Sequence, residues 1–292
     1  MMTKTFHRIY ILVLVLIGIV TFIFLGIYGF SYYSTSNEER FFHQLHKILK
    51  PSGVIGHGLG IIGSLMMIIG VSSYMLRKRV RSFTRLGVLK HWLEMHIFLC
   101  SVGPILVLYH TSFKFGGIVA VSFWSMIAVV ISGVIGRFIY IQIPRSIQGQ
   151  EYSLDELKSI NQEYTDRLKV EFGLDDMLIT KLEHFHKIEV HKRANFFLIS
   201  GLIIRDYFSN KKLIGEIKRE LISKDIRPTS VKEIVKLCNS KLVLSRRISL
   251  LHSVHTIFKY WHIIHLPFAI IMLVIMMVHV GVTVAFGYKW IF

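Results

Sequence analysis

The chain alternates between long apolar runs and polar segments. Five runs carry at most one charged residue each, and they occupy residues 9–30, 53–76, 92–109, 117–141 and 263–288. An α-helix rises about 1.5 Å per residue, so runs of this length can cross the roughly 30 Å hydrocarbon core of a bilayer. The pattern predicts an all-α integral membrane protein of about five transmembrane helices, in contact with membrane lipid.

One polar segment, residues 142–258, is long enough to form a domain. It mixes acidic and basic residues, and Ser153 followed by Glu156 has the pattern of a capping box at the start of a helix. Apolar residues then recur at helical spacing, so we expect a small helical cytoplasmic insert. The predicted domains are an N-terminal anchor helix with its outer loop (1–50), transmembrane helices 2–4 (51–141), the insert (142–258) and transmembrane helix 5 (259–292).

Composition agrees with a membrane location and excludes several other classes. Of 292 residues, 52% are hydrophobic, the mean hydropathy is +0.52 and the net charge is +17. Basic chains often bind nucleic acid, but here the charge lies largely beside the apolar runs, so we expect no nucleic-acid partner. The two cysteines form no C-x-x-C-H or C-x-x-C motif, which excludes c-type haem attachment and argues against zinc or iron–sulfur sites built on such pairs.

Lysine and arginine also predict the orientation of the chain. Segment 77–90 carries six basic residues and no acidic one, whereas the short link 110–117 carries only Lys114. Because basic loops stay in the cytoplasm, we expect segment 77–90, the insert and the N-terminus inside. The link 110–117, the loop 31–50 and the C-terminus are then expected outside.

Four histidines in two apolar runs form the most specific chemical pattern. His96 and His110 lie in the third run, His265 and His279 lie in the fifth, and each pair is separated by fourteen residues. Fourteen residues make almost four helical turns, so both imidazoles of a pair project from nearly the same face, about 21 Å apart. The two helices should run in the same direction, which brings the first histidines level with each other and the second histidines likewise. Paired imidazoles at two depths predict two bis-histidine haem b sites.

Other interpretations of these histidines remain open. A histidine inside a helix often only packs or makes a hydrogen bond, and about one pair at this spacing is expected by chance among 15 histidines. His43 and His57 are such a pair, with Lys47, Lys50 and Pro51 between them. A metal transporter would gather its ligands at one depth, not at two levels along both helices. Ionisable groups inside a membrane are functional by default, which favours haem.

Small and polar residues near these runs are further candidates for the cofactor sites. Gly60 lies on a glycine stripe of the second run, and Gly103 lies midway between the two histidines of the third. Small residues admit a neighbouring helix, and they would equally admit a porphyrin face. His57, at the outer end of the second run, is either a packed histidine or a neighbour of a haem propionate or quinol.

Three further residues lie at the cytoplasmic ends of the runs. Arg137 and His262 are either ligands for the propionates of the inner haem, through charge pairing, or anchors at the membrane interface. Glu94, close to the start of the third run, is either a proton carrier linked to quinone or an interfacial carboxylate. The sequence leaves these alternatives open.

Several segments resemble the bacterial di-haem membrane cytochromes b, a family related in architecture to ferric-reductase-like proteins and more distantly to the cytochrome b of respiratory quinol-oxidising complexes. The resemblance covers roughly residues 50–145 and 255–290. The segments that carry it are WLEMH (92–96), HTSFKFGG (110–117), SGVIGR (132–137), IPR (143–145), WHIIHLPF (261–268) and VHVG (278–281). The paired histidines are its specific element, and the glycines are not.

The resemblance implies a haem-binding four-helix bundle in a prokaryotic cytoplasmic membrane, with His96, His110, His265 and His279 as the axial ligands of two haems b. It implies an electron-transfer subunit of a quinol-oxidising complex, whose partners are membrane quinone and a multihaem c-type cytochrome or other redox subunit outside. The insert stands where eukaryotic members carry a flavin and nicotinamide domain, so NAD(P)H is not the expected donor. The alternatives are a free-standing ferric or metal reductase, and a non-redox membrane scaffold or metal transporter.

Overall fold

The chain divides into two compact units, which the computed structural model describes at residues 4–83, 86–145, 151–184, 196–224 and 226–286. The membrane unit comprises Met1–Ile135 and Ile263–Phe292, and the insert unit comprises Gly136–His262. All elements named within the described ranges are helices, as the hydrophobic pattern predicts.

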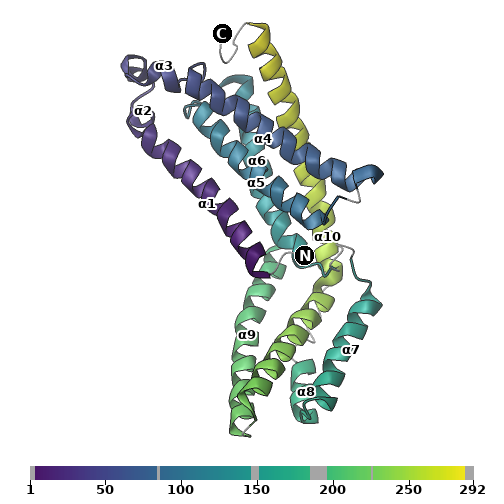
Figure 1. Cartoon of the computed structure of the whole chain (residues 1–292). Coiled ribbons are helices and arrows are strands. Elements are labelled where there is room, and N and C mark those ends of the chain that lie inside the picture. The colour runs from purple at the N-terminus through teal and green to yellow at the C-terminus, as the bar shows by residue number, and fades with distance from the viewer. Residues whose placement is uncertain (1–3, 84–85, 146–150, 185–195, 225, 287–292) are drawn as a thin grey trace. The chain divides into compact units, whose positions relative to one another are not determined.

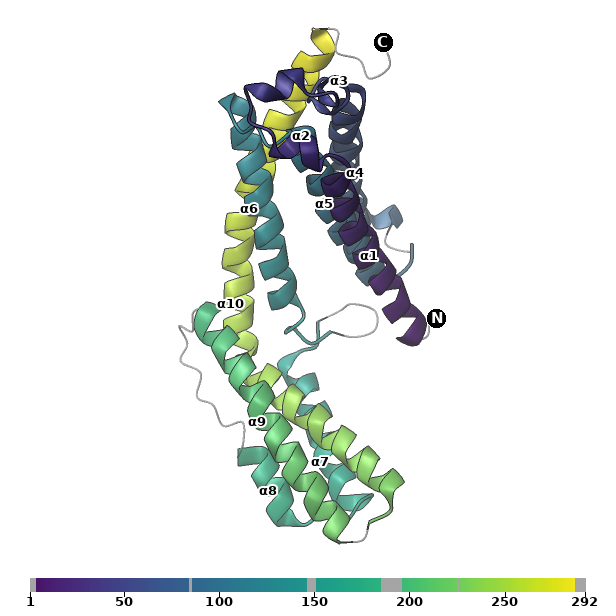
Figure 2. The same cartoon turned by 90° about the vertical axis from the view of Figure 1, so that its left-hand side faces the viewer.

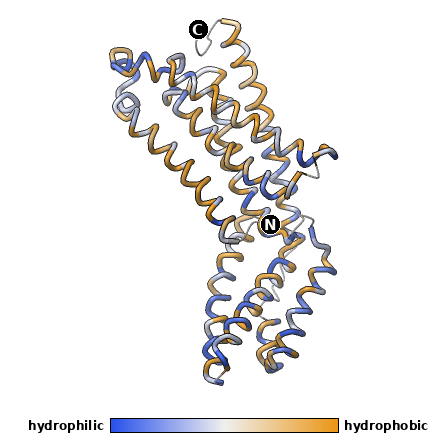
Figure 3. Tube along the Cα trace, viewed as in Figure 1, coloured by the Kyte–Doolittle hydropathy of each residue, from blue (hydrophilic) through white to orange (hydrophobic). Residues whose placement is uncertain are grey.

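Five helices of the described residues are long and apolar enough to cross a membrane. They are α1 (Lys4–Tyr28), α4 (Val54–Arg79), α5 (Leu89–His110), α6 (Gly117–Tyr140) and α10 (Pro228–Ala285). Figure 3 shows apolar residues along the first four and along the C-terminal part of α10, which belongs to the membrane unit. These helices confirm the prediction of a membrane protein. The last two residues of the predicted fifth span, 287–288, lie outside the described part.

Short helices connect the spans of the membrane unit. The connection from α1 to α4 contains α2 (Phe30–Ser34), the 3-10 helix η1 (Glu39–Phe42) and α3 (His46–Leu49). The 3-10 helix η2 (Arg81–Phe83) begins the connection from α4 to α5. Gly29 separates α1 from α2, so the first long helix ends two residues earlier than the apolar run predicts.

Buried Arg40 is hydrogen-bonded both to the connection that follows α1 and to the connection that follows α5. Its Nε donates to the carbonyl oxygen of Thr35 at 2.9 Å, and its two Nη atoms donate to those of Ser112 at 2.5 Å and Tyr33 at 2.7 Å. Three carbonyl acceptors compensate the burial of the guanidinium charge. Burial also raises the pKa of Tyr33 to about 12, so this phenol stays neutral. The two connections therefore lie at the same end of the membrane unit, as the alternation of spans predicts.

Helix α10 continues from the insert unit into the membrane unit without a break. The predicted domain boundary at residue 258 falls inside this helix, which runs from Pro228 to Ala285. No glycine or proline occurs between Pro228 and Pro267, so nothing in the backbone ends the helix where the surroundings change from polar to apolar.

The insert unit is a small helical domain. Helices α7 (Leu154–Val170), α8 (Asp176–His184) and α9 (Phe196–Ser223) lie beside the first part of α10 (Figures 1 and 2). Ser153 and Glu156 form the capping box that the sequence predicts. The core consists of buried aliphatic side chains, among them Leu168, Leu182, Ile217, Leu221, Ile234 and Leu242.

Candidate functional site

Helices α4 and α5 pack against each other in a register that repeats every seven residues. At the centre, Gly63 lies against Gly103, and a Cβ atom on either glycine would come within 2.7–2.8 Å of the carbonyl oxygen of the other. Seven residues to either side of Gly103 are His96 and His110. Because seven residues make almost two helical turns, both histidines return to the same interface. The register therefore places two imidazoles of α5 against α4.

Each of these imidazoles bonds through Nδ1 to a glycine carbonyl of α4. The distance from Nδ1 of His96 to the oxygen of Gly70 is 3.1 Å, and that from Nδ1 of His110 to the oxygen of Gly56 is 2.8 Å. A helical carbonyl retains a second lone pair, and at glycine no side chain covers it. Since a carbonyl only accepts hydrogen bonds, Nδ1 carries the hydrogen. Nε2 then carries the free lone pair. Metal-ligating histidines typically have this arrangement, with one ring nitrogen donating a hydrogen bond and the other binding the metal.

In α10, the two histidines share the face that is turned toward the rest of the membrane unit. His265 and His279 are partly buried, and Met272 and Met276 between them are buried. Neighbouring side chains on the other faces are exposed, including Ile264, Leu266, Leu273, Val274, Met277 and Val278. The buried positions recur every three to four residues, so both histidines lie on one helix face as their spacing predicts.

Ser132 of α6 orients the imidazole of His265. The distance between its Oγ and Nδ1 of His265 is 2.5 Å. The serine hydroxyl also lies 3.1 Å from the carbonyl oxygen of Val129, which can only accept. When the serine donates to Val129, Nδ1 of His265 is the protonated nitrogen, as in the two histidines of α5.

Three helices contribute a histidine to the level of His110. The ring centroids of His57 and His110 are 6.4 Å apart, and both imidazoles are close enough to His279 to interact electrostatically. The structure thus brings His57 close to His110 and places His279 within electrostatic range of both, and ligation of one haem by His110 and His279 stays a prediction. The described contacts of His96 run to α4 and to Cys100 of its own helix, and Nδ1 of His265 is hydrogen-bonded to α6, so the pairing of these two rings stays a prediction.

A buried apolar cluster lies among α4, α6 and α10. Its buried members are Met67, Phe123, Met126, Met272 and Met276. The two methionines of α10 stand between that helix's two histidines in the sequence. Methionine side chains are flexible and polarizable, and they fill irregular space without offering a charge. The residues between the two histidine positions therefore form an apolar layer.

Gly60 and Gly103 both serve the close approach of α4 and α5. A Cβ atom on Gly60 would lie 2.7 Å from Nδ1 of His110, so this glycine makes room for the imidazole ring. A Cβ atom on Gly103 would meet Gly63 and Met67 of α4. Helix approach is one of the two roles that the sequence leaves open for such glycines, and a contact with a porphyrin stays a prediction.

Arg137 and His262 belong to the insert unit. The Arg137 guanidinium lies 5.6 Å from the centroid of the Tyr140 ring, a cation–π contact. The Nδ1 atom of His262 donates to the carbonyl oxygen of Phe258 at 3.0 Å, and its ring packs edge-on against Phe258 and Trp261. Propionate binding by these two residues stays a prediction.

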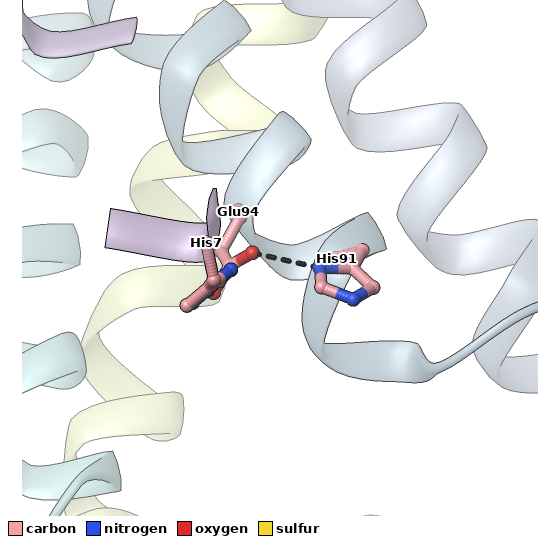
Figure 4. Close-up of side chains that lie close together, drawn as sticks. All are labelled: His7, His91 and Glu94. Carbon is pink, nitrogen blue, oxygen red and sulfur yellow. Dashed lines mark hydrogen bonds and ion pairs between the residues drawn. The ribbon is translucent and has the colours of Figure 1, made fainter. Parts of the chain in front are cut away.

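One further group of ligating side chains did not emerge from the sequence. His7 of α1 and His91 and Glu94 of α5 hold ligand atoms within 4.8 Å of one another (Figure 4). The spacing of His91 and Glu94 is that of neighbours on a helix and could have been noticed. His7 comes from a distant part of the chain, and only the fold brings it to the other two.

Comparisons with protein-family models, with curated proteins and with solved structures give no match for this chain. The function of the chain is therefore inferred from its own residues and their geometry. The chain has oriented imidazoles on α5 and α10 and an apolar layer between the two histidine levels. It also has a separate group of two histidines and a carboxylate.

Proposed function

We propose that the chain is a di-haem b-type cytochrome subunit that moves electrons across a membrane. The observation that carries the proposal is the matched orientation of His96 and His110, each bonded through Nδ1 to a glycine carbonyl of α4. The two imidazoles are fourteen residues apart on one helix, and in both of them Nε2 is the unprotonated nitrogen. A histidine that only packs against its neighbours does not need such a hydrogen bond at two levels of one helix. Two metal-ligating histidines in one helix need it at both levels.

The four imidazoles are suited to hold two haems b, one by His96 with His265 and one by His110 with His279. Bound haem b supplies a reversible one-electron carrier. The hydrogen bonds at Nδ1 of His96, His110 and His265 fix the orientation of these rings, and a bond donated by Nδ1 raises the basicity of Nε2. The methionine-rich layer excludes water between the two positions. Arg137 and His262 are the candidates for the inner propionates, and His57 is the candidate neighbour of the outer haem.

The donor in this proposal is membrane quinol, and the acceptor is a multihaem c-type cytochrome outside. Quinol dissolves in the bilayer and needs no docking domain, and five spans offer it a lipid-facing surface. The outer connections are short helices and a short link, which form too small a surface to enclose a soluble acceptor. The basic segment 77–90 supports a cytoplasmic N-terminus, and the prokaryotic membrane is what the family resemblance implies. The resemblance to bacterial di-haem membrane cytochromes b supports the same assignment.

The proposal predicts two haems b per chain. The full chain, purified from membranes in detergent, should give a ratio of haem to protein near two in a pyridine haemochrome assay. Addition of a water-soluble quinol should then reduce the bound haem, as followed in the visible spectrum. A ratio near zero would exclude the redox assignment and leave a scaffold or metal transporter. Rapid reduction of ferric chelates by the isolated chain, with no partner subunit in native membranes, would favour a free-standing reductase.

Ser132→Ala is expected to weaken the site of His265 selectively. The variant loses the hydroxyl that is hydrogen-bonded to Nδ1 of His265, and loss of such a partner typically lowers metal affinity by about 10–100-fold. Retention of haem during dilution should reveal the loss. Ser122→Ala is the matched control, because its hydroxyl also bridges α6 to α10, donating to the carbonyl oxygen of Met272 at 3.1 Å without touching a histidine. Equal haem retention in both variants would contradict the orienting role of Ser132.

A further inference from the structure

We infer that His7, His91 and Glu94 form a binding site for a divalent transition-metal ion of the zinc class. The site lies where the N-terminal ends of α1 and α5 meet (Figure 4). The Glu94 side chain is 4% exposed, whereas those of His7 and His91 are 22% and 41% exposed. An ion can therefore reach the buried carboxylate past the two more accessible imidazoles.

The distances between the ligand atoms are close to those of a metal site. Nε2 of His7 lies 3.3 Å from Oε1 of Glu94, and Nδ1 of His91 lies 3.0 Å from Oε2 of the same carboxylate. Nitrogen and oxygen ligands about 2.0–2.2 Å from a tetrahedral zinc ion are roughly 3.3–3.5 Å apart. Since all three ligand atoms lie within 4.8 Å of one another, a movement of at most about 1.5 Å brings them to that separation.

Without a metal, the contacts of His7 cannot all be satisfied. Its Nε2 lies 2.9 Å from Nζ of Lys90 as well as 3.3 Å from the Glu94 carboxylate. A neutral imidazole nitrogen either donates to the carboxylate or accepts from the ammonium, and it cannot do both. Nδ1 of His7 is buried and has no hydrogen-bond partner within the described part of the chain, which leaves Nε2 as the ring nitrogen that faces the carboxylate. A metal ion in place of the ammonium would accept the lone pair of His7 Nε2 and would bind the Glu94 carboxylate at the same time.

Ligand chemistry selects the class of ion. Two imidazoles and one carboxylate suit zinc and its first-row neighbours, whereas magnesium and calcium prefer oxygen ligands. Three protein ligands leave a coordination position for water. Lys90 Nζ is 3.7 Å from the Glu94 carboxylate, and its side chain is half exposed, so it can leave when the ion enters. Lys90 and the metal therefore compete for the same carboxylate.

The site is separate from the histidine levels and would act on α1. Residues two apart on a helix do not face each other, so Glu94 points away from the α4 side, where His96 is bonded. Helix α1 is bonded to α5 near its other end, where the Tyr109 hydroxyl donates to the carbonyl oxygen of Phe22 at 2.8 Å. A bound ion would add a second link between α1 and α5, at the N-terminal end of α1. Both ends of α1 would then be held against α5.

Metal binding by the full chain in detergent tests the inference. The protein is prepared without a polyhistidine tag and equilibrated with Zn²⁺ buffered by a chelator, and zinc and iron per chain are measured in the same samples. We expect about one zinc per chain. His7→Ala and His91→Ala should each weaken zinc binding by at least about tenfold, because even loss of an outer hydrogen-bond partner of a ligand costs that much. Lys90→Gln should tighten zinc binding, because it removes the competitor.

The exposed histidine His252 supplies the control, and His252→Ala should bind zinc like the unchanged protein. Iron per chain should be the same in all variants, so the outcome is independent of whether the haem proposal holds. Zinc binding that is unchanged in both His7→Ala and His91→Ala would overturn the inference, as would a wild-type chain that binds no more zinc than these variants. Weaker binding in Lys90→Gln would show that the lysine supports the site and would contradict the competition.

Discussion

Replacing His110 by alanine should leave a chain that binds about one haem in place of two. His110 is oriented by the Gly56 carbonyl and lies within electrostatic range of His279, whereas His96 is held separately by the Gly70 carbonyl. Loss of one axial imidazole should empty the outer position and leave the inner one. The pyridine haemochrome assay should show the halved ratio, and the reduced spectrum should retain the absorption of the remaining haem.

Double substitutions give the sharper form of this test. His279→Ala should remove the same haem as His110→Ala, and the two together should lose no more than either alone. His96→Ala combined with His110→Ala should abolish haem binding, while the exposed control His252→Ala should retain two haems. If His96→Ala and His279→Ala removed the same haem, the parallel pairing of α5 with α10 would be wrong.

Gly63→Ala should damage both haem positions at once. The added Cβ atom would lie 2.7 Å from the backbone oxygen of Gly103, and backbone cannot move aside as a side chain can. Forcing an extra carbon into such a contact typically costs about 1–3 kcal/mol. Because this crossing sets the register of α4 on α5, the separation should weaken the hydrogen bonds of His96 and His110 together. Haem per chain and the thermal unfolding temperature in detergent should both fall.

Gly133→Ala is the matched control for this substitution. A Cβ atom on Gly133 of α6 has no neighbour within 4 Å, so alanine fits there. Glycine costs a helix about 0.5–1 kcal/mol relative to alanine, so this variant should be as stable as the parent or slightly more so. Haem loss confined to one level in Gly63→Ala, with unchanged stability, would show that the crossing does not control both histidines.

Much of the fold follows from the sequence because it depends on local patterns. Long apolar runs predict the five long helices, and the spacing of His265 and His279 predicts the helix face that they share. The groups that orient the imidazoles are different in kind. The Gly56 and Gly70 acceptors are backbone carbonyls, and every residue has one. Only the register of α4 on α5 decides which carbonyls meet an imidazole.

Long-range contacts account for the other features that the sequence does not reveal. His7 joins His91 and Glu94 although more than eighty residues separate them, and no local pattern links the two segments. Arg40 looks like one more surface charge in the sequence, yet carbonyl groups of two connections between the long helices surround it. Helix α10 is continuous because its central part has no helix-breaking residues. The sequence suggests a boundary there only because the hydropathy changes.

The seven-residue register of α4 on α5 limits how these helices can vary in length. Deleting one residue of α4 between Gly56 and Gly63 would turn one half of the helix by about 100° relative to the other. One imidazole would keep its carbonyl, and the other would face a side chain instead. Removal of seven residues would return Gly56 to the same helix face, but about 10 Å along the helix from His110, so its carbonyl would still not meet the imidazole. Related chains should therefore vary in their loops and keep the number of residues between these glycines unchanged.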